Sequence, residues 1–338
     1  MAVLPDRVIE ASDAYRENRD SLLRQIAALD EQLATVNGGG GPKYIARHRE
    51  RGKLLVRERI EALLDVGSPF LELCPLAAYG STFPVGAGTV SGIGFVEGVE
   101  CMITGSDPTV RGGAMNPYSL RKNLRTNDII RENRLPTIAL TESGGADLPT
   151  QSEVFIPGGR GFRDITSASA AGIPQISLVF GNSTAGGAYV PGMSDYVVMI
   201  KERSKVFLGG PPLVKMATGE DSDDESLGGA EMHARVSGLA DYFAVDEMDA
   251  IRIGRQIVKR LNPFANATTG AAPAVNNPWM KHVDSDAQGY AVVTLSKTEL
   301  LCDFKKMVRQ AGGVAPSAPI ASVKRVRVAA GVTDVTVV

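Results

Sequence analysis

The sequence has few of the residues that build disulfide frameworks and metal centres. It contains three cysteines and three histidines in 338 residues, and all six are scattered along the chain. Widely separated cysteines predict neither a disulfide-stapled domain nor a four-cysteine zinc site, and isolated histidines argue against a histidine-based catalytic triad. We therefore expect no bound metal, and chemistry that does not depend on thiol or imidazole groups.

The chain also lacks a strong charge of either sign and lacks long apolar runs. The formal net charge is −2 and the pI is about 6.0, so no electrostatic attraction to nucleic acid or to an anionic membrane is expected. No apolar run approaches the length of a membrane span, and the N-terminus has no signal-peptide core. These absences predict a soluble, cytoplasmic protein with neither a nucleic-acid partner nor a membrane partner.

Glycine is abundant, and it occurs twice in the same pattern within residues 141–188. Apolar, β-branched runs that start at Pro136 and Pro174 each break into a polar turn and a glycine pair, followed by a helix-compatible segment. The pairs are Gly144-Gly145 and Gly186-Gly187. Glycine lets the backbone approach a ligand, and the start of a helix offers unpaired N–H groups. A single glycine pair is usually an ordinary turn. Two matched turns facing one cavity are suited to hold a thioester oxygen as it becomes an enolate.

The rest of the chain divides into three regions. Residues 1–41 are an N-terminal helix with a glycine linker, and Leu22, Ile26 and Leu29 belong to its apolar seam, which predicts docking on the body or on a second subunit. Residues 42–262 form the main domain. They begin with a basic amphipathic segment (43–64) that is either a solvated helix face or a patch for a polyphosphate. Residues 263–338 are a linker and a β-rich tail.

Within the main domain the patterns alternate between strands and helices. We expect a hairpin at Glu97-Gly98 and a repeated ββα order that coils on itself. The other predicted elements are helices at 118–133, 231–236 and 247–261 and strands at 195–200, 205–208 and 242–245. In the tail, 289–295 and 322–338 are predicted to be β-structure, and 299–308 a strand or a short helix.

Five motifs together resemble a known family. They are RGKLLVRERIEALL from Arg51, GSPFLEL from Gly67, ESGGA from Glu142, AGGAYVP from Ala185 and VFLGGPPLVKMATGE from Val206. They are similar to the carboxyltransferase β subunit of biotin-dependent acyl-CoA carboxylases, of the methylcrotonyl-, geranyl- and propionyl-CoA type. The resemblance covers about residues 43–262, the N-terminal half of such a subunit. It implies an α/β, crotonase-like (ClpP/crotonase) spiral of ββα units, here with an N-terminal helical segment and an appended β-rich tail.

The resemblance also implies a reaction and a site. The family moves a carboxyl group from carboxybiotin, carried on a partner subunit or domain, to an acyl-CoA. By resemblance, the backbone amides of Gly144, Gly145, Gly186 and Gly187 would hold the enolate. The residues implied to contact coenzyme A are Ser143, Ala146, Ala185, Arg57 and Lys122. The implied partners are a biotin carboxylase/biotin carrier α subunit and further copies of this chain in a homo-oligomer.

The sequence departs from the family after about Asn262, because the expected second half does not follow. The tail instead resembles, over a short stretch, the C-terminal end of D-type alkaline phosphatases, which suggests a fusion or rearrangement. Two alternatives therefore stay open. One is an acyl-CoA-binding module without the biotin half. The other is a crotonase-type hydratase or hydrolase with a carboxylate as general acid or base. Glu142, Asp147 and Glu153 are the nearest carboxylates, although loop carboxylates are usually solvated.

Overall fold

The structure is a computed structural model, and it describes residues 12–261, 289–295, 299–307, 320–329 and 336–337. The chain divides into two compact units. The larger unit is Arg19–Asn262, and the smaller combines Met1–Asn18 with Pro263–Val338. Within the described part of the chain, no helix is both long and apolar enough to cross a membrane.

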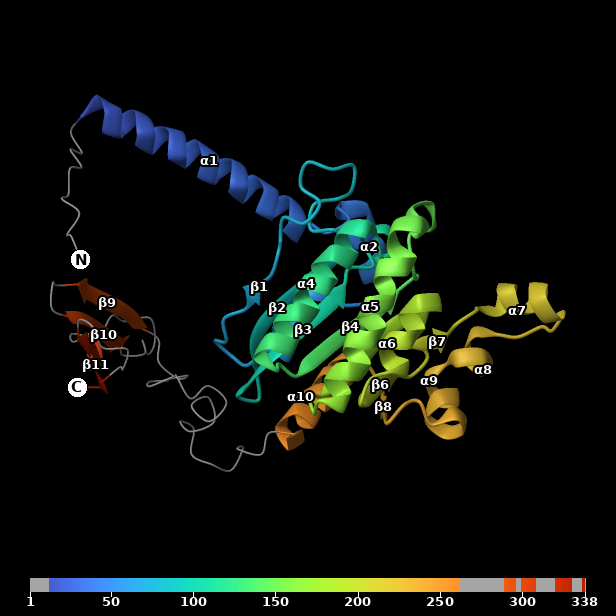
Figure 1. Ribbon diagram of the computed structural model, residues 1–338. Coiled ribbons are helices and arrows are strands. Elements are labelled where there is room, and N and C mark those ends of the chain that lie inside the picture. The colour runs from blue at the N-terminus through green and yellow to red at the C-terminus, as the bar shows by residue number, and fades with distance from the viewer. Residues whose placement is uncertain (1–11, 262–288, 296–298, 308–319, 330–335, 338) are drawn as a thin grey trace. The chain divides into compact units, whose positions relative to one another are not determined.

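A mixed eight-stranded sheet forms the centre of the larger unit (Figure 1). Its order is β1-β2-β3-β4-β5-β6-β8, and β7 pairs with β5. The first three strands are antiparallel and the strands from β3 onward run parallel. The bounds are β1 Leu71–Glu72, β2 Thr89–Val96, β3 Val99–Ser106, β4 Thr137–Ser143, β5 Gln175–Thr184, β6 Tyr196–Ile200, β7 Lys205–Phe207 and β8 Tyr242–Ala244.

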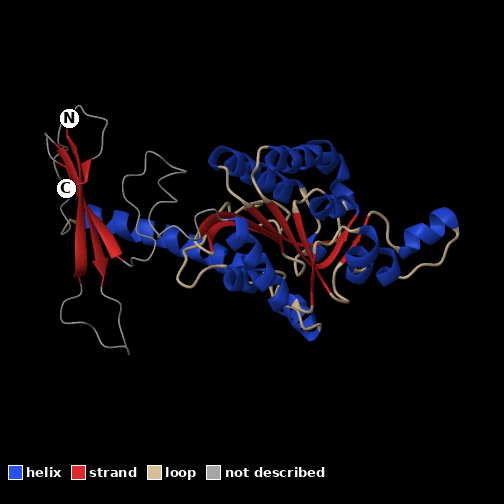
Figure 2. Cartoon of the chain, turned by 90° about the horizontal axis from the view of Figure 1, so that it is seen from below, coloured by secondary structure: helices blue, strands red, loops and turns tan. Residues whose placement is uncertain are grey.

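Helices cover both faces of this sheet, as Figure 2 shows. The α-helices are α1 Asp13–Asn37, α2 Pro42–Glu50, α3 Val56–Leu63, α4 Pro117–Asn133, α5 Gln151–Ala170, α6 Tyr189–Gly192, α7 Pro211–Thr218, α8 Asp224–Gly228, α9 Ala230–Met232 and α10 Glu247–Leu261. Short 3-10 turns occur at η1 Arg111–Gly113, η2 Leu148–Thr150 and η3 Ala185–Ala188, and a π-helical turn, η4, at His233–Ser237.

The main core lies between the sheet and the pair α3 and α10. The side chains of α10 that face it recur at helical spacing, which gives the helix one apolar stripe. They meet buried strand residues such as Ile138 and Leu178. A smaller cluster on the other face joins β3 to α4 and α5 through Met102, Ile130 and Ala168. The sheet is covered on both faces, which explains why the sequences of β4 and β5 are nearly continuous apolar runs.

Most predicted elements are confirmed. The hairpin turns between Val96 and Val99, and α10 begins and ends where expected, with Asp246 Oδ1 accepting from the Asp249 N–H at 2.8 Å. The segment 43–64 is not continuous, because the chain turns at Gly52, which has φ +65°. The predicted helix at 231–236 is instead the short α9 followed by the π-helical turn η4.

The described tail residues form a four-stranded antiparallel sheet of their own, in the order β12-β11-β10-β9. Its strands are β9 Gly289–Leu295, β10 Glu299–Met307, β11 Ile320–Ala329 and β12 Thr336–Val337. The segment predicted as a strand or a short helix is therefore a strand. The predicted linker at 263–278 lies outside the described residues.

The close contact between α10 and β5 gives a test of the packing. A Cβ added to Gly254 would lie 2.8 Å from Leu178 Cδ1, whereas one added to Gly161, also helical, would meet nothing within 4 Å. We expect Gly254→Ala to lower the free energy of unfolding by about 1–3 kcal/mol through overpacking. The control Gly161→Ala should be neutral or stabilising by about 0.5–1 kcal/mol. Urea denaturation measures both, and equal effects would contradict the packing described here.

Candidate active site

The first glycine turn follows β4 and is hydrogen-bonded to the neighbouring loop that contains Gly112 and Met115. Gly145 has φ +94°, a conformation that side-chain-bearing residues rarely adopt. The N–H of Gly144 donates to the carbonyl of Gly112 at 3.2 Å, and the N–H of Met115 donates to the carbonyl of Gly145 at 2.8 Å. Ala146 forms an isolated bridge with Met115. The turn is therefore held by backbone contacts on both sides of its glycine pair.

The second glycine turn follows β5 and lies against the first. Strands β4 and β5 are parallel, with Ser143 opposite Ser183. A Cβ on Gly145 would lie 3.4 Å from Ala185 Cβ, and one on Gly187 would lie 3.7 Å from Ser143 Cβ. The structure thus brings the two predicted turns side by side at one edge of the sheet, close enough that one added methyl group would reach from one turn to the other.

The backbone amides of the first pair already have acceptors within the protein. Gly144 donates to Gly112, and the N–H of Gly145 donates to Ser143 Oγ at 3.1 Å. The Ser143 hydroxyl in turn donates to the carbonyl of Gly113 at 2.9 Å. The expectation of unpaired N–H groups is therefore wrong at this turn, because buried backbone donors find partners in the folded chain. An oxyanion bound here by Gly145 would take the place of the Ser143 hydroxyl.

The segments that follow the two turns differ from each other in structure, although the sequence predicts a helix after each. The first pair is separated from α5 by the 3-10 turn η2, and the second pair is itself part of the 3-10 turn η3, followed by the four-residue helix α6. A helix this short has a small macrodipole. What the turns offer a ligand is therefore individual amides and close backbone approach.

The two cations implied to contact coenzyme A, Arg57 and Lys122, each have a partner within the protein. Arg57 makes a two-pronged ion pair with Glu72, at 2.7 and 3.0 Å. Lys122 is 3 % exposed, and its Nζ donates to the carbonyl of Thr89 at 2.6 Å. The sequence identifies both as cations on amphipathic helices but does not tell which side chains turn inward.

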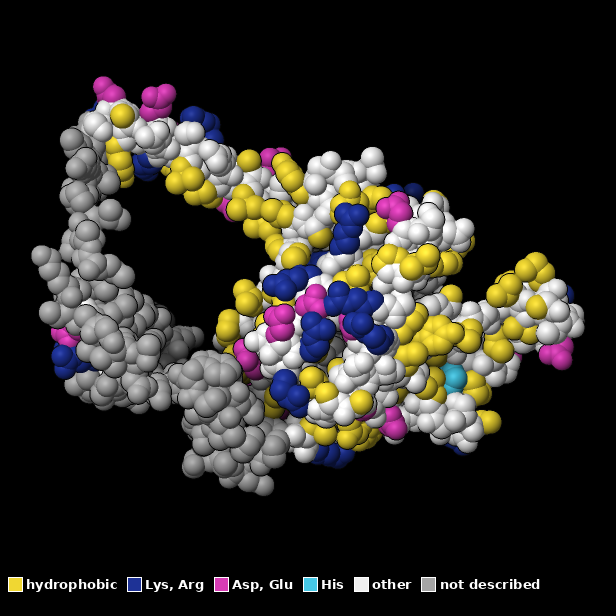
Figure 3. Space-filling view, viewed as in Figure 1, with side chains coloured by type: hydrophobic (Ala, Val, Ile, Leu, Met, Phe, Trp, Pro, Cys, Tyr) yellow, Lys and Arg dark blue, Asp and Glu magenta, His cyan; other side chains and the backbone are white. Residues whose placement is uncertain are grey.

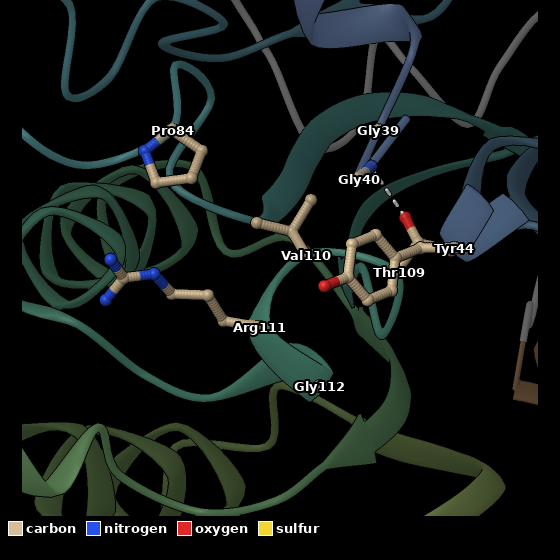
Figure 4. A pocket seen from close by; sticks show the side chains of 8 residues that line it. All are labelled: Gly39, Gly40, Tyr44, Pro84, Thr109, Val110, Arg111 and Gly112. Carbon is tan, nitrogen blue, oxygen red and sulfur yellow. Dashed lines mark hydrogen bonds between the residues drawn. The ribbon is translucent and has the colours of Figure 1, made fainter. Parts of the chain in front are cut away.

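A cavity of about 330 Å³ adjoins the first turn, and sequence reasoning missed it. In Figure 4, Pro84 and Arg111 lie on one side of it and Tyr44 and Thr109 on the other. The cavity is lined by Gly39, Gly40, Tyr44, Pro84, Thr109, Val110, Arg111 and Gly112. The carbonyl of Gly112 is the one that accepts from Gly144, so the cavity and the turn share a residue.

Arg111 is the cation at this cavity, and its backbone is strained. Its φ is +49°, and Gly112 and Gly113 continue in the same left-handed region. Strained non-glycine residues of this kind cluster at functional sites. The guanidinium lies 4.9 Å from the centre of the Phe83 ring and 3.4 Å from Asp147 Oδ1, just past the first turn. The available signal in the sequence was an arginine followed directly by two glycines, Arg111-Gly112-Gly113.

A buried ion cluster lies directly behind the first turn. Glu142, the residue before Ser143, is 8 % exposed and is paired with Lys53 and with Arg59, whose Nη1 lies 2.8 Å from Glu142 Oε2. Burial alone would raise the pKa of Glu142, but attraction to Arg59 and Lys53 outweighs it and lowers the pKa. Glu142 is thus no solvated loop carboxylate, and it is held as an anion.

Comparison with known proteins identifies the family. Residues 47–310 match the model of the carboxyl transferase domain. A Mycobacterium tuberculosis protein named probable biotin-dependent acyl-coenzyme A carboxylase beta2 subunit is 68 % identical over 263 residues, 78 % of this chain and 49 % of that protein. The Drosophila melanogaster probable methylcrotonoyl-CoA carboxylase beta chain is 47 % identical over 266 residues, 77 % of this chain and 46 % of its own. The chain belongs to the carboxyl transferase family.

Solved structures agree with this assignment. The Pseudomonas aeruginosa geranyl-CoA carboxylase beta subunit superposes with a TM-score of 0.70 at 42 % identity, over 76 % of this chain and 48 % of that one. Transcarboxylase 12S superposes with a TM-score of 0.65 at 28 % sequence identity, over 70 % of this chain and 47 % of that one. The carboxyl transferase chain has the predicted crotonase-like α/β fold and spans about half the length of its curated relatives. The match to the family model extends to residue 310, beyond Asn262, where the larger compact unit of the structure ends. The domain boundaries expected from the sequence, at residues 41 and 262, stay predictions.

No metal-binding group is found among the described residues of this carboxyl transferase chain. There, no cluster of three or more histidine, cysteine, aspartate or glutamate side chains could hold an ion. Cys74 and Cys101 are free thiols, and burial, the largest cause, raises the pKa of Cys101, which keeps it protonated.

The buried lysine gives a pH-dependent prediction. Burial lowers the pKa of Lys122 from 10.5 to about 8. Between these values the unfolded chain still binds the proton that the folded chain has released, so folding stability rises with pH. Relative to Lys122→Met, the wild type should gain on the order of 3 kcal/mol as pH rises from about 7 to 10.5.

Chemical denaturation at each pH measures this difference. The control is Lys201→Met, since the Lys201 side chain is half-exposed. That control should follow the wild type at every pH. A constant offset between wild type and Lys122→Met would show that Lys122 titrates normally.

Proposed function

We propose that this chain supplies the acyl-CoA side of a biotin-dependent carboxyltransferase. The observation that carries the proposal is the close approach of two glycine turns at the ends of adjacent parallel strands, where a Cβ on Gly145 would lie 3.4 Å from Ala185 Cβ. In this proposal, amides from both turns hold the thioester oxygen as charge develops on it. The carboxyl group comes from carboxybiotin carried by a biotin carboxylase/biotin carrier partner subunit, and it is transferred to the acyl-CoA.

We further propose an apolar, methylcrotonyl-like acyl group. The named relatives include methylcrotonoyl- and geranyl-CoA carboxylase beta subunits. The apolar side chains beside the turns agree with such a group. Phe162 and Tyr189 have ring centres 5.0 Å apart, and Phe162 is the nearest atom group to a Cβ built on Gly186, at 3.9 Å. A nonpolar acyl chain loses no hydrogen bonds on entering such surroundings.

The nucleotide end of coenzyme A is proposed to lie in the cavity at Arg111. An arginine offers paired donors for phosphate, and the half-exposed Tyr44 ring offers a face on which a purine can stack. Arg57 and Lys122 are less suited to this role, because their charged groups already bind Glu72 and the Thr89 carbonyl. The chain's own residues would thus bind and orient the thioester from both ends.

Exposed apolar side chains support the proposal that further protein packs beside the turns. Leu148, Phe155 and Ile156 are all exposed in the single chain, and Figure 3 shows hydrophobic side chains gathered over α5 and α6. The exposed seam of α1, which contains Leu22 and Ile26, is a second such surface. Surfaces of this kind mark protein interfaces. We propose a homo-oligomer in the cytoplasm, with the biotin side of the site contributed by protein outside the described residues.

The acyl-CoA-binding module remains a second candidate, because the two turns and the cavity at Arg111 could bind a thioester without catalysing transfer. The hydratase alternative is weaker. Of the candidate carboxylates, Glu142 is paired with Arg59 and Lys53 and Asp147 lies 3.4 Å from Arg111 Nη1. A carboxylate held by a cation is poorly suited to exchange a proton with substrate.

Replacing Gly145 with alanine, which rarely adopts the positive φ of this position, tests whether the first turn belongs to the thioester site. With φ +94° and Ala185 Cβ 3.4 Å away, Gly145→Ala should displace the first turn and weaken binding of a CoA thioester at least about tenfold. Gly172→Ala is the matched control, since Gly172 has φ +73° but nothing within 4 Å and lies at the other end of β5. Calorimetric titration measures both affinities, and equal affinities would remove Gly145 from the site.

Carboxyl transfer is then assayed with the chain, a biotin carboxylase/carrier subunit and methylcrotonyl-CoA. Product formation that requires biotin supports the enzyme. Tight thioester binding without transfer supports the binding module, and hydration of the thioester without biotin supports the hydratase. If the wild type neither binds nor transfers, the proposed function is wrong.

A further inference from the structure

The charge cluster behind the first turn consists of Lys53, Arg59, Glu142, Arg203 and Glu247. Arg59 is 1 % exposed, and its guanidinium contacts both carboxylates, with Glu142 at 2.8 Å and Glu247 at 2.9 and 3.0 Å. Lys53 completes the contacts of Glu142, and Arg203 lies 3.5 Å from Glu247. Three cations thus face two carboxylates, so the cluster already has an excess of positive charge, and loss of either carboxylate would add to the buried positive charge.

This cluster touches both strands that carry the glycine turns. On β4, Glu142 immediately precedes Ser143, the hydroxyl that holds the Gly145 amide. On β5, the Arg59 guanidinium lies 4.3 Å from the centre of the Phe180 ring, and a Cβ on Gly181 would lie 2.6 Å from Glu142 Oε1. Only glycine at 181 leaves room for the carboxylate between the strands. The Glu142 carboxylate is therefore fixed against both strands just before they turn.

The cluster also anchors the chain segments behind the sheet. Glu247, at the start of α10, accepts from the backbone N–H of Leu54 at 3.1 Å, and Arg203 donates to the carbonyl of Gly52 at 2.8 Å. These contacts fix the segment that carries Lys53 into α3. None of the five side chains lines the cavity at Arg111, so the cluster acts on the turns from behind.

We propose that this charge cluster positions the two glycine turns relative to each other, so that thioester affinity depends on Glu142 offsetting the charge of the cations that face it. Oxyanion donors lose most of their effect when displaced by a fraction of an ångström. The members of the cluster are positioning residues, because they act through Ser143 and the turns. The inference rests on the proposed function for its binding measurement and on the ligand-free turn for a second measurement.

The main test compares Glu142→Gln with a double variant that restores the net charge of the wild-type cluster. Glu142→Gln keeps the shape but leaves the two cations facing an uncharged amide, and it should weaken binding of a nonhydrolysable CoA thioester analogue at least about tenfold. Lys53→Met with Glu142→Gln removes one cation as well and leaves Arg59 paired with Glu247. It should recover most of the affinity. Glu97→Gln, which breaks the pair with Arg255 at the hairpin, is the control and should bind as wild type.

Circular dichroism and thermal melting accompany the titrations to separate position from stability. A Glu142→Gln chain that melts at lower temperature but binds as wild type would show a merely structural role and overturn the proposal, as would a double variant no better than the single. If Glu142→Gln does not fold, Glu247→Gln decides, because it likewise leaves Arg59 facing an uncharged amide. Severalfold weaker binding supports the proposal, and unchanged binding overturns it.

Hydrogen exchange in the ligand-free protein keeps this inference separate from the proposed function. Glu142→Gln should speed amide exchange in residues 142–147 and 183–188, while exchange in α10 and β6 stays slow. If the wild type fails to bind any thioester, the proposed function is wrong, but faster exchange confined to the two turns would still support positioning. Unchanged exchange in both turns would overturn it.

Discussion

The structure depends on keeping one buried guanidinium, that of Arg59, paired. A charge this deep in the protein costs several kcal/mol unless opposite charges and hydrogen bonds surround it. Its two carboxylates come from β4 and from the start of α10, and its central carbon lies 4.3 Å from the centre of the Phe180 ring of β5. Arg59 therefore joins the N-terminal helices, the central strands and the closing helix in one arrangement, and both glycine turns follow directly from strands that meet it.

The two turns show how a parallel sheet makes a site from ordinary backbone. Neighbouring parallel strands end at the same edge, so whatever follows β4 lies beside whatever follows β5. The serines opposite each other, Ser143 and Ser183, each donate a hydrogen bond to a carbonyl of the turn region, Gly113 and Gly187 respectively. No acid–base side chain is needed for such a site to stabilise an oxyanion. The scarcity of histidine and cysteine is consistent with that chemistry.

Sequence patterns predicted the backbone of this chain better than the contacts of its side chains. The glycine pairs, the hairpin and α10 follow from local rules of turn chemistry and periodicity, which act over a few residues. The surroundings of Lys122 and Glu142 depend on which elements meet across the fold. Glu142 was expected in solvent, yet Lys53 and Arg59, more than 80 residues earlier, bury it. Likewise, the cavity at Arg111 takes residues from three separate stretches, so no local pattern marks it.

The central claim is that the two turns form one binding site for a thioester oxygen. The most direct measurement is a crystal structure of this chain with a CoA analogue that carries an enolate-like oxygen. The account predicts that this oxygen lies about 2.7–3.1 Å from a backbone nitrogen of each turn, with the Gly145 amide released from Ser143. An analogue bound with its oxygen away from both turns, or held by one turn alone, would contradict it.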